Sequence, residues 1–213
     1  MKIYTCFGDK GKTKLISGEI VDKNDKLIVA YGNVDKLIAF LGFIISFYKE
    51  FYSYIIKNKY KLKKINIIME LLNDIQLILF NLSTDLASTN LNDKQLNKFK
   101  IKRITENDVK NLEKIIDKIL EKSNKIDSFV IPSNNVLSSM LHYLRTLTRE
   151  AEVKIIDCLN HYDINKNILS FINRLSDLFF AIALYLETLI NNDIKLLKNH
   201  KEKQLFKDFF EKF

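Results

Sequence analysis

Apolar residues recur at helical spacing along most of this chain. The pattern predicts helices over residues 33–57, 65–88, 105–123, 134–160 and 165–192. All five glycines fall within residues 8–42, and the single proline is Pro132. Because both residue types interrupt helices, we expect a glycine-bearing loop segment over 1–32, a bundle over 33–192 and a lysine-rich helical tail over 193–213. Short connections favour one all-α domain, an antiparallel five-helix bundle.

Two of the expected helices carry a polar face beside the apolar one. The helix over 134–160 has an apolar stripe of Val136, Met140, Leu144, Leu147, Ala151 and Ile155, and a polar stripe of His142, Arg145, Arg149 and Glu152. The helix over 165–192 has an apolar stripe of Ile168, Ile172, Leu175, Phe179 and Ile182, with Asn173 and Asp177 on another face. Spacing leaves two interpretations open: a solvated surface with an ordinary Arg–Glu pair, or an anion site for a polyphosphate.

Charge adds weight to the second interpretation only through the arginines. The 213 residues carry a formal net charge of +8, and most of the basic residues are lysines. A lysine-rich composition by itself says little, so nucleic-acid binding is the weakest of the hypotheses. The only arginines are Arg103, Arg145, Arg149 and Arg174. A planar guanidinium group binds phosphate through several donors at once, which makes the close pair Arg145 and Arg149 notable.

The cysteines and the lengths of the apolar runs indicate the cellular compartment of the protein. Cys6 and Cys158 have neither a metal-ligand spacing nor a disulfide framework, which fits a reducing compartment. The first four residues lead into a polar glycine segment and give no signal peptide. The longest apolar runs, 37–48 and 178–190, are too short to span a bilayer, and Glu187 interrupts the second. We expect a cytoplasmic or mitochondrial-matrix protein without a membrane segment.

The N-terminal segment over residues 5–14 has the composition of a phosphate-binding loop. Gly8 and Gly11 permit close backbone approach, Thr5 and Thr13 offer hydroxyls, and three lysines supply charge. The spacing G-x-x-x-x-G-K-S/T of a Walker A loop is absent. Alone the signal is weak, since many glycine loops are only turns.

Five motifs in order over residues 1–190 resemble the PduO-type ATP:corrinoid adenosyltransferase family. The first is Tyr4-Thr5…Gly8-Asp9-Lys10-Gly11…Thr13, which corresponds to the family's Y-T-x-x-G-D-x-G-x-T. The second is Lys23 to Asp25 with Ala30-Tyr31-Gly32…Val34-Asp35, which corresponds to K-D-D…A-Y-G-T-V-D-E-L. The third is Ile75-Gln76, Leu79-Phe80 and Asp85-Leu86-Ala87. The last two are Phe129…Ile131-Pro132 followed by His142…Arg145-Thr146…Arg149…Ala151-Glu152, and Ile172-Asn173-Arg174-Leu175-Ser176-Asp177-Leu178…Phe180.

The resemblance implies a homotrimer of ferritin-like five-helix bundles with active sites between subunits. Each site would join the N-terminal segment of one chain to the arginine helix of its neighbour. The residues implied for ATP are Thr5, Cys6, Phe7, Gly8, Thr13, Lys14, Lys23, Arg149, Glu150, Glu152 and Asn173. Asp35 and Arg145 match a pair that bridges subunits and positions the corrin, and Phe129 matches the aromatic residue at the lower corrin face.

The implied reaction transfers the 5′-deoxyadenosyl group of ATP to cob(I)alamin, giving adenosylcobalamin and triphosphate. ATP, Mg²⁺ and cobalamin would take part, with no metal held by protein ligands alone. A flavoprotein reductase and a cobalamin-dependent acceptor enzyme are the implied partners, with neither nucleic acid nor membrane. The alternative is a trimeric nucleotide- or corrinoid-binding protein of the same fold with weakened catalysis.

Several positions depart from the family pattern. They are Cys6-Phe7, Ile38, Ser133-Asn134, Glu150 and Val153, and Glu150 replaces an expected arginine. A carboxylate about 5 Å from a phosphate charge costs roughly 3 kcal/mol at an effective dielectric near 20. Unrelieved, this would weaken ATP binding by about two orders of magnitude. We hypothesise that Lys12, Lys14 and Lys36 offset the charge.

Overall fold

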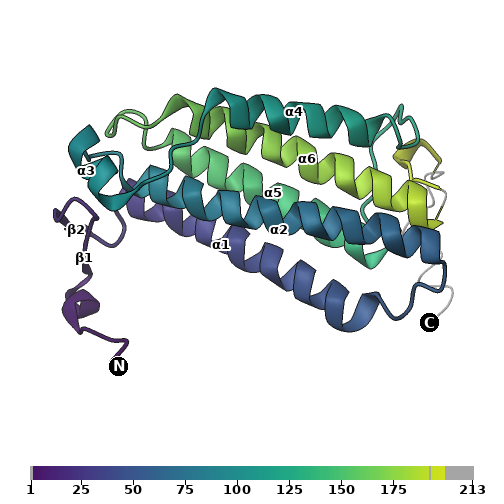
Figure 1. The fold of residues 1–213 in the computed structure, drawn as a ribbon, viewed down its shortest axis with the longest axis horizontal. Coiled ribbons are helices and arrows are strands. Elements are labelled where there is room, and N and C mark those ends of the chain that lie inside the picture. The colour runs from purple at the N-terminus through teal and green to yellow at the C-terminus, as the bar shows by residue number, and fades with distance from the viewer. Residues whose placement is uncertain (1, 192, 200–213) are drawn as a thin grey trace, which may run out of the picture.

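The computed structural model describes residues 2–191 and 193–199, and it is almost entirely helical. The helices are α1 (Lys26–Phe47), α2 (Lys59–Ala87), α3 (Asp93–Phe99), α4 (Glu106–Leu120), α5 (Val136–Ile156) and α6 (Lys166–Asn191). The five long helices lie alongside one another, and the short α3 lies at one end (Figure 1). The prediction of an all-α fold is confirmed.

The core of the bundle lies around α6. This helix packs against α5 and α4, while α1 packs against α5 and α2. The whole apolar stripe predicted for α6 is buried, and Phe171 and Phe179 are the largest fully buried side chains. Burial of aliphatic and aromatic surface on this scale is the main stabilising term for such a bundle.

The buried face of α5 differs from the predicted stripe. Val136 is 48% exposed, whereas Leu137, Leu141 and His142 are buried. Because α5 packs against both α1 and α6, its buried side chains cover a wider arc of the helix than the predicted stripe, and the arc is shifted away from Val136. This shift takes His142 off the surface.

The first helix begins earlier than predicted. It starts at Lys26 rather than residue 33, and the Asp25 carboxylate caps it by accepting the Leu27 amide at 2.8 Å. Gly32, taken as a loop signal, lies inside α1, and a Cβ added there would meet nothing within 4 Å. An exposed helical glycine costs only about 1 kcal/mol relative to alanine, so the apolar face of α1 outweighs it.

The residues before α1 form a small appendage rather than an unstructured loop. A single 3₁₀ turn, η1 (Phe7–Lys10), precedes an antiparallel hairpin of β1 (Lys12–Lys14) and β2 (Ile20–Asp22). The appendage lies beyond the end of the bundle where α1 begins (Figure 1). Of the predicted C-terminal helical tail, residues 193–199 instead form a bridge from Leu196 to Val130 and the turn η3 (Leu197–Asn199); residues 200–213 lie outside the described part.

Within the described residues, three helical stretches are long and apolar enough to cross a membrane by length and composition. They are Lys26–Tyr52, which includes the π-helical turn η2 (Tyr48–Tyr52), Lys59–Ala87 and Lys166–Asn191. Uninterrupted apolar runs did not reveal them because polar residues are interspersed. The chain buries 61% of the apolar window in α6 but only 39% of those in α1 and α2. The helices α1 and α2 thus present apolar surface that one chain does not cover.

Candidate functional site

A cavity of about 680 Å³ lies between α5, α6 and the connection from α4 to α5. Its lining includes Phe129, His142, Arg145, Arg149, Asp177 and Phe180, and we call it the arginine cavity. Three of the residues singled out from the sequence, Phe129, Arg145 and Arg149, thus face one space. Asp177 and Phe180 lie within a sequence motif but had been given no role in a site.

The two guanidinium groups of the arginine cavity are available to an anion. Arg145 and Arg149 lie one turn apart on α5, and the Arg145 guanidinium lies 5.9 Å from the centroid of the Phe180 ring. The Nε atom of Arg145 is buried without a hydrogen-bond partner in the described part of the chain. Within residues 2–191 and 193–199, neither arginine forms an ion pair, so the ordinary Arg149–Glu152 pair is not observed. Unpaired guanidinium donors favour the polyphosphate interpretation.

Phe129 projects into solvent although its backbone is fixed. Its carbonyl accepts the Leu197 amide at 2.8 Å, and the neighbouring Ile131 amide donates to Lys195 at 2.8 Å. The side chain is nevertheless 81% exposed. A core aromatic would be buried, so Phe129 has no packing role within this chain. A rigidly mounted, exposed ring is suited to lie against a flat apolar ligand.

A buried polar cluster of Ser138, His142 and Glu187, which we call the floor, adjoins the arginine cavity, and His142 is the member that lines it. The Ser138 hydroxyl donates to the buried Glu187 carboxylate, whose Oε1 lies 3.9 Å from His142 Nε2. Burial, assisted by the positive charge of Arg145, lowers the pKa of His142 to about 4, and burial raises the pKa of Glu187. His142 is therefore neutral near pH 7. The lone carboxylate within the apolar run 178–190, Glu187, was a sign of this cluster that sequence reasoning did not use.

Glu152 and Asn173 are joined directly. The Asn173 amide donates to Glu152 Oε1 at 2.8 Å, and Arg174 donates to Asn173 Oδ1 at 2.8 Å. Arg174 also donates to Glu113 of α4 at 2.9 Å. This chain of hydrogen bonds crosses α5, α6 and α4, and it fixes the side chain of Asn173 in one orientation.

Glu150 is paired by a lysine of α1. The Lys36 amino group donates to Glu150 Oε1 at 3.0 Å, with both side chains about half exposed. The contact places Lys36 where the hypothesised offset of Glu150 needs it, whereas Lys12 pairs with Asp22 in the hairpin. Asp35 is exposed on α1 and, among the described residues, forms no ion pair with Arg145. One chain therefore does not bring the predicted Asp35–Arg145 pair together.

The N-terminal residues expected at the nucleotide gather in the appendage. A Cβ added at Gly8 would lie 2.7 Å from the Lys23 amino group, so the two residues are in contact. Thr13 pairs with Val21 in the hairpin, and Lys14 is its last residue on β1. Thr5, Cys6 and Phe7 are exposed, and Cys6 has a positive φ of 60°. Thr5, Cys6 and Phe7 are thus accessible to a ligand.

The start of α1, which carries the appendage, lies beside the loop between α5 and α6, where Lys26 contacts His161 and the Tyr162 hydroxyl donates to Asp25. Arg149, Glu152 and Asn173 lie in the halves of α5 and α6 nearer that end, whereas the connection from α4 to α5 lies at the other end (Figure 1). In the described residues, no group of three His, Cys, Asp or Glu side chains is placed to hold a metal ion.

A family model described as cobalamin adenosyltransferase matches residues 3–186. A corrinoid adenosyltransferase from Citrobacter freundii is 36% identical over 187 residues, which cover 88% of this chain and 96% of that protein. The mouse corrinoid adenosyltransferase MMAB is 30% identical over 199 residues, covering 93% of this chain and 78% of the relative. These matches extend over the motifs quoted above.

Solved structures give the same result in three dimensions. A variant PduO-type ATP:corrinoid adenosyltransferase from Lactobacillus reuteri, complexed with cobalamin and ATP, superposes with a TM-score of 0.78 at 34% identity. The match covers 94% of this chain and 99% of that one. A second variant of that enzyme, complexed with ATP, has a TM-score of 0.74 at the same identity.

Proposed function

Because the chain belongs to the cobalamin adenosyltransferase family, we infer that it transfers the 5′-deoxyadenosyl group of ATP to reduced cobalamin. The products are adenosylcobalamin and triphosphate. The observation that carries this function to the chain's own residues is the arginine cavity, where two guanidinium groups without carboxylate partners lie beside an exposed aromatic ring.

The ATP site that we propose has a rigid half and an exposed half. The rigid half is on the bundle, where Arg149 would bind the triphosphate and the fixed pair Glu152–Asn173 would orient the nucleotide. The exposed half is the appendage, with these candidate residues: Thr5, Cys6, Phe7, Gly8, Thr13, Lys14 and Lys23. Mg²⁺ would arrive with the phosphates, which supply many of its ligands in nucleotide sites.

We propose a homotrimer in which the appendage of one chain meets the arginine cavity of its neighbour, as the family resemblance implies. The appendage projects beyond the end of the bundle, where it can contact another chain (Figure 1). The same arrangement would let Asp35 of one chain reach Arg145 of the next. An aromatic surface on α1 and α5 offers an interface: Phe40 packs edge-on against Tyr143 at 5.0 Å and beside Phe43 at 5.8 Å. Exposed aromatic side chains are enriched at such contacts.

For the corrin we propose a position against Phe129. An apolar ring at the lower face would exclude an axial nitrogen ligand, which makes Co(II) easier to reduce. The resulting Co(I) supplies the electron pair of the new cobalt–carbon bond to the ribose 5′ carbon. The carbon–oxygen bond breaks, and triphosphate leaves with that bond's electron pair. Arg149 stabilises the charge that accumulates on the leaving group, and positioning supplies most of the remaining acceleration.

Glu150 does not exclude this function. Its pairing with Lys36 partly compensates the carboxylate charge next to the proposed phosphate position. The alternative of a binding protein with weakened catalysis rested on this substitution, so the pair weakens its main support.

We place the protein in the cytoplasm or mitochondrial matrix, with a flavoprotein reductase and a cobalamin-dependent acceptor enzyme as partners.

The deciding experiment is anaerobic incubation with ATP and chemically reduced cobalamin. We expect the corrin absorption spectrum to change to that of adenosylcobalamin, with one triphosphate released per turnover. ATP binding without the spectral change would instead indicate the binding protein. Sedimentation of the same sample tests the trimer separately.

A further inference from the structure

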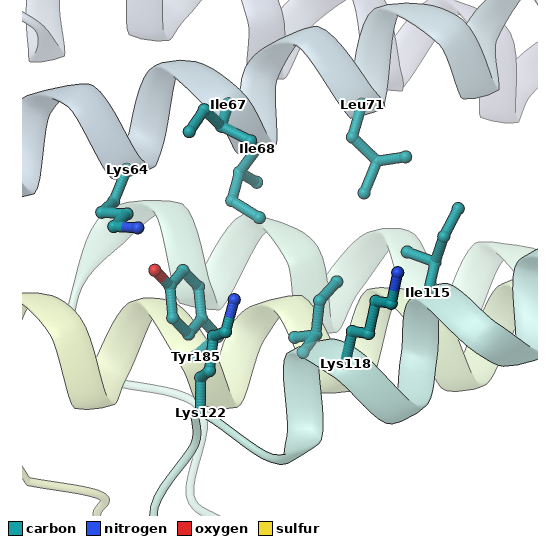
Figure 2. A pocket seen from close by; sticks show the side chains of 9 residues that line it. Lys64, Ile67, Ile68, Leu71, Ile115, Lys118, Lys122 and Tyr185 are labelled. Carbon is teal, nitrogen blue, oxygen red and sulfur yellow. The ribbon is translucent and has the colours of Figure 1, made fainter.

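A groove runs between α2 and α4 and shares no lining residue with the arginine cavity. It encloses a cavity of about 290 Å³ with aliphatic walls formed by Ile67, Ile68 and Leu71 of α2 and by Ile115 and Ile119 of α4 (Figure 2). The groove exists because α2 and α4 each pack mainly on other helices and scarcely contact each other. Ile67 remains 49% exposed at its edge.

One end of the groove is polar. Lys64, Lys122 and the phenol of Tyr185 lie together there, and these three residues also line an adjoining cavity of about 640 Å³ (Figure 2). Tyr185 comes from α6, which closes the groove from below. The aliphatic residues continue from this end toward Leu71 and Ile115. The groove therefore has a polar end and a mainly aliphatic remainder, in which Lys118 adds an amino group beside Ile115 (Figure 2).

The charge of the polar end has one sign. No Asp or Glu lines either cavity, and within the described residues neither Lys64 nor Lys122 forms an ion pair. Lys64 instead lies 5.5 Å from the centroid of the Tyr60 ring. Lys118 lines the groove further along, so three ammonium groups and a phenol donor face it with no carboxylate among the described lining residues, which is complementary to an anionic ligand.

We propose that the groove binds a free long-chain fatty acid. The carboxylate would lie between Lys64, Lys122 and the Tyr185 hydroxyl, and the alkyl chain would lie along the aliphatic walls. From Asn58 to Leu71 the lining follows α2 for about 20 Å, a length suited to an extended alkyl chain. Such a lining, mainly apolar with a few convergent polar groups, is typical of small-molecule sites.

The groove would stay open in the proposed trimer. That assembly uses the appendage, α1, α5 and the arginine cavity, whereas the groove is built by α2, α4 and a residue of α6, Tyr185, that does not line the arginine cavity. Fatty-acid binding therefore does not depend on the adenosyl-transfer chemistry, and either proposal can fail without the other.

The test uses the full chain and cis-parinaric acid, whose fluorescence rises in an apolar site. We expect saturable binding of one probe per chain below the concentration at which the free acid aggregates. Palmitate should displace the probe, whereas hexadecanol should displace it at least about tenfold less well because it lacks the charge. Butyrate should not displace it, because it lacks the chain.

Two variants and one matched control locate the site. The double substitution Lys64→Glu with Lys122→Glu should weaken probe binding by about tenfold or more. Ile67→Trp should block the aliphatic slot while leaving its charge intact. The control, Lys63→Glu with Lys114→Glu, makes the same charge change at exposed positions of α2 and α4 outside the groove and should bind normally. Adenosyl transfer by all three variants should match the parent, which shows that they are folded.

Four results would overturn the proposal. The first is equal displacement by hexadecanol and palmitate, and the second is unaltered binding in the Ile67→Trp variant. The third is binding that occurs only after residues 200–213 are removed, since that segment would then be the occupant of the groove. A change in oligomeric state caused by Ile67→Trp would likewise assign the groove to a second copy of the chain.

Discussion

The arginine cavity and the N-terminal appendage contribute to the same proposed site but are built in opposite ways. The cavity is fixed by the packing of α5 on α6 and by buried polar contacts such as Ser138–Glu187. The appendage has one short hairpin and an exposed 3₁₀ turn. We infer that the cavity is preorganised for charge stabilisation, while the appendage acquires its binding geometry only against ATP and a neighbouring chain.

The strongest test of a preorganised cavity is removal of Arg149. Arg149→Ala should lower kcat/KM for ATP by about 10²–10³-fold, the usual effect of losing one preorganised charge-stabilising donor. Arg149→Lys keeps the charge but loses the planar fork, and it should fall between the parent and the alanine variant. Anaerobic turnover measures both. Retention of full activity by Arg149→Ala would remove the cavity from the mechanism.

The buried floor of the cavity predicts an acid-sensitive fold. The His142 pKa of about 4 in the folded state lies below its ordinary 6.5, so the unfolded chain binds more protons and stability falls as pH drops from about 6.5 toward 4. At pH 5 this loss amounts to about 2 kcal/mol relative to pH 7. Glu187, with its raised pKa, acts in the opposite direction.

The variant His142→Gln isolates the contribution of the histidine, because Glu187 and Arg145 remain in place. Its Tm should fall less between pH 7 and pH 5 than the Tm of the parent. Equal falls in the two proteins would mean that His142 titrates normally and that the floor is open to water.

Phe129 tests whether an exposed ring can matter more for function than for stability. Phe129→Ala should change the free energy of unfolding by less than about 0.5 kcal/mol, since the ring packs on little within the chain. It should nevertheless slow adenosyl transfer at least about tenfold, a barrier increase near 1.4 kcal/mol. Tyr54→Ala, at an equally exposed 81%, is the matched control and should leave turnover unchanged.

On the appendage, Gly8 and Gly32 make a matched pair of substitutions. In Gly8→Ala the new Cβ would lie only 2.7 Å from the Lys23 amino group, so the lysine side chain has to move. We expect KM for ATP to rise about three- to tenfold with unchanged stability. Gly32→Ala meets no atom within 4 Å and should stabilise α1 by up to about 1 kcal/mol without affecting KM. Similar KM values for the two variants would show that the Gly8–Lys23 contact is not part of the nucleotide site.

Sequence reasoning succeeded where local pattern and packing agree. Helices α2, α4, α5 and α6 lie within a few residues of the ranges predicted from apolar spacing, except that α2 begins six residues early. It failed where a local signal was outweighed, as at Gly32, where the glycine suggested a loop and the apolar face together with the Asp25 cap extended α1 instead. The hairpin and α3 were missed because elements this short carry too few positions for a periodicity.

For the site, the residue types were predictable but their partners were not. The motifs placed Phe129, Arg145 and Arg149 on the candidate list, and the structure brings these three to one cavity. Spacing along one helix could not reveal that Glu187 of α6 lies near His142, or that Glu152 bonds Asn173, because these contacts depend on how two helices rotate against each other. The roles of all these residues in ATP and corrin binding remain predictions.

The smallest expected effect concerns the contact between α1 and the edge of the cavity. Lys36→Ala leaves the Glu150 carboxylate unpaired near the proposed phosphate position, so KM for ATP should rise about two- to fivefold. Glu150→Ala alone should lower KM slightly, and the double variant should restore a value near that of the parent. The coupling energy should be about 0.2–1 kcal/mol, since both side chains are half exposed, and it should shrink in high salt. Additive effects of the two substitutions would mean that Lys36 does not compensate the charge of Glu150. A carboxylate beside Arg149 would then need another cation, such as a lysine from the appendage of a neighbouring chain.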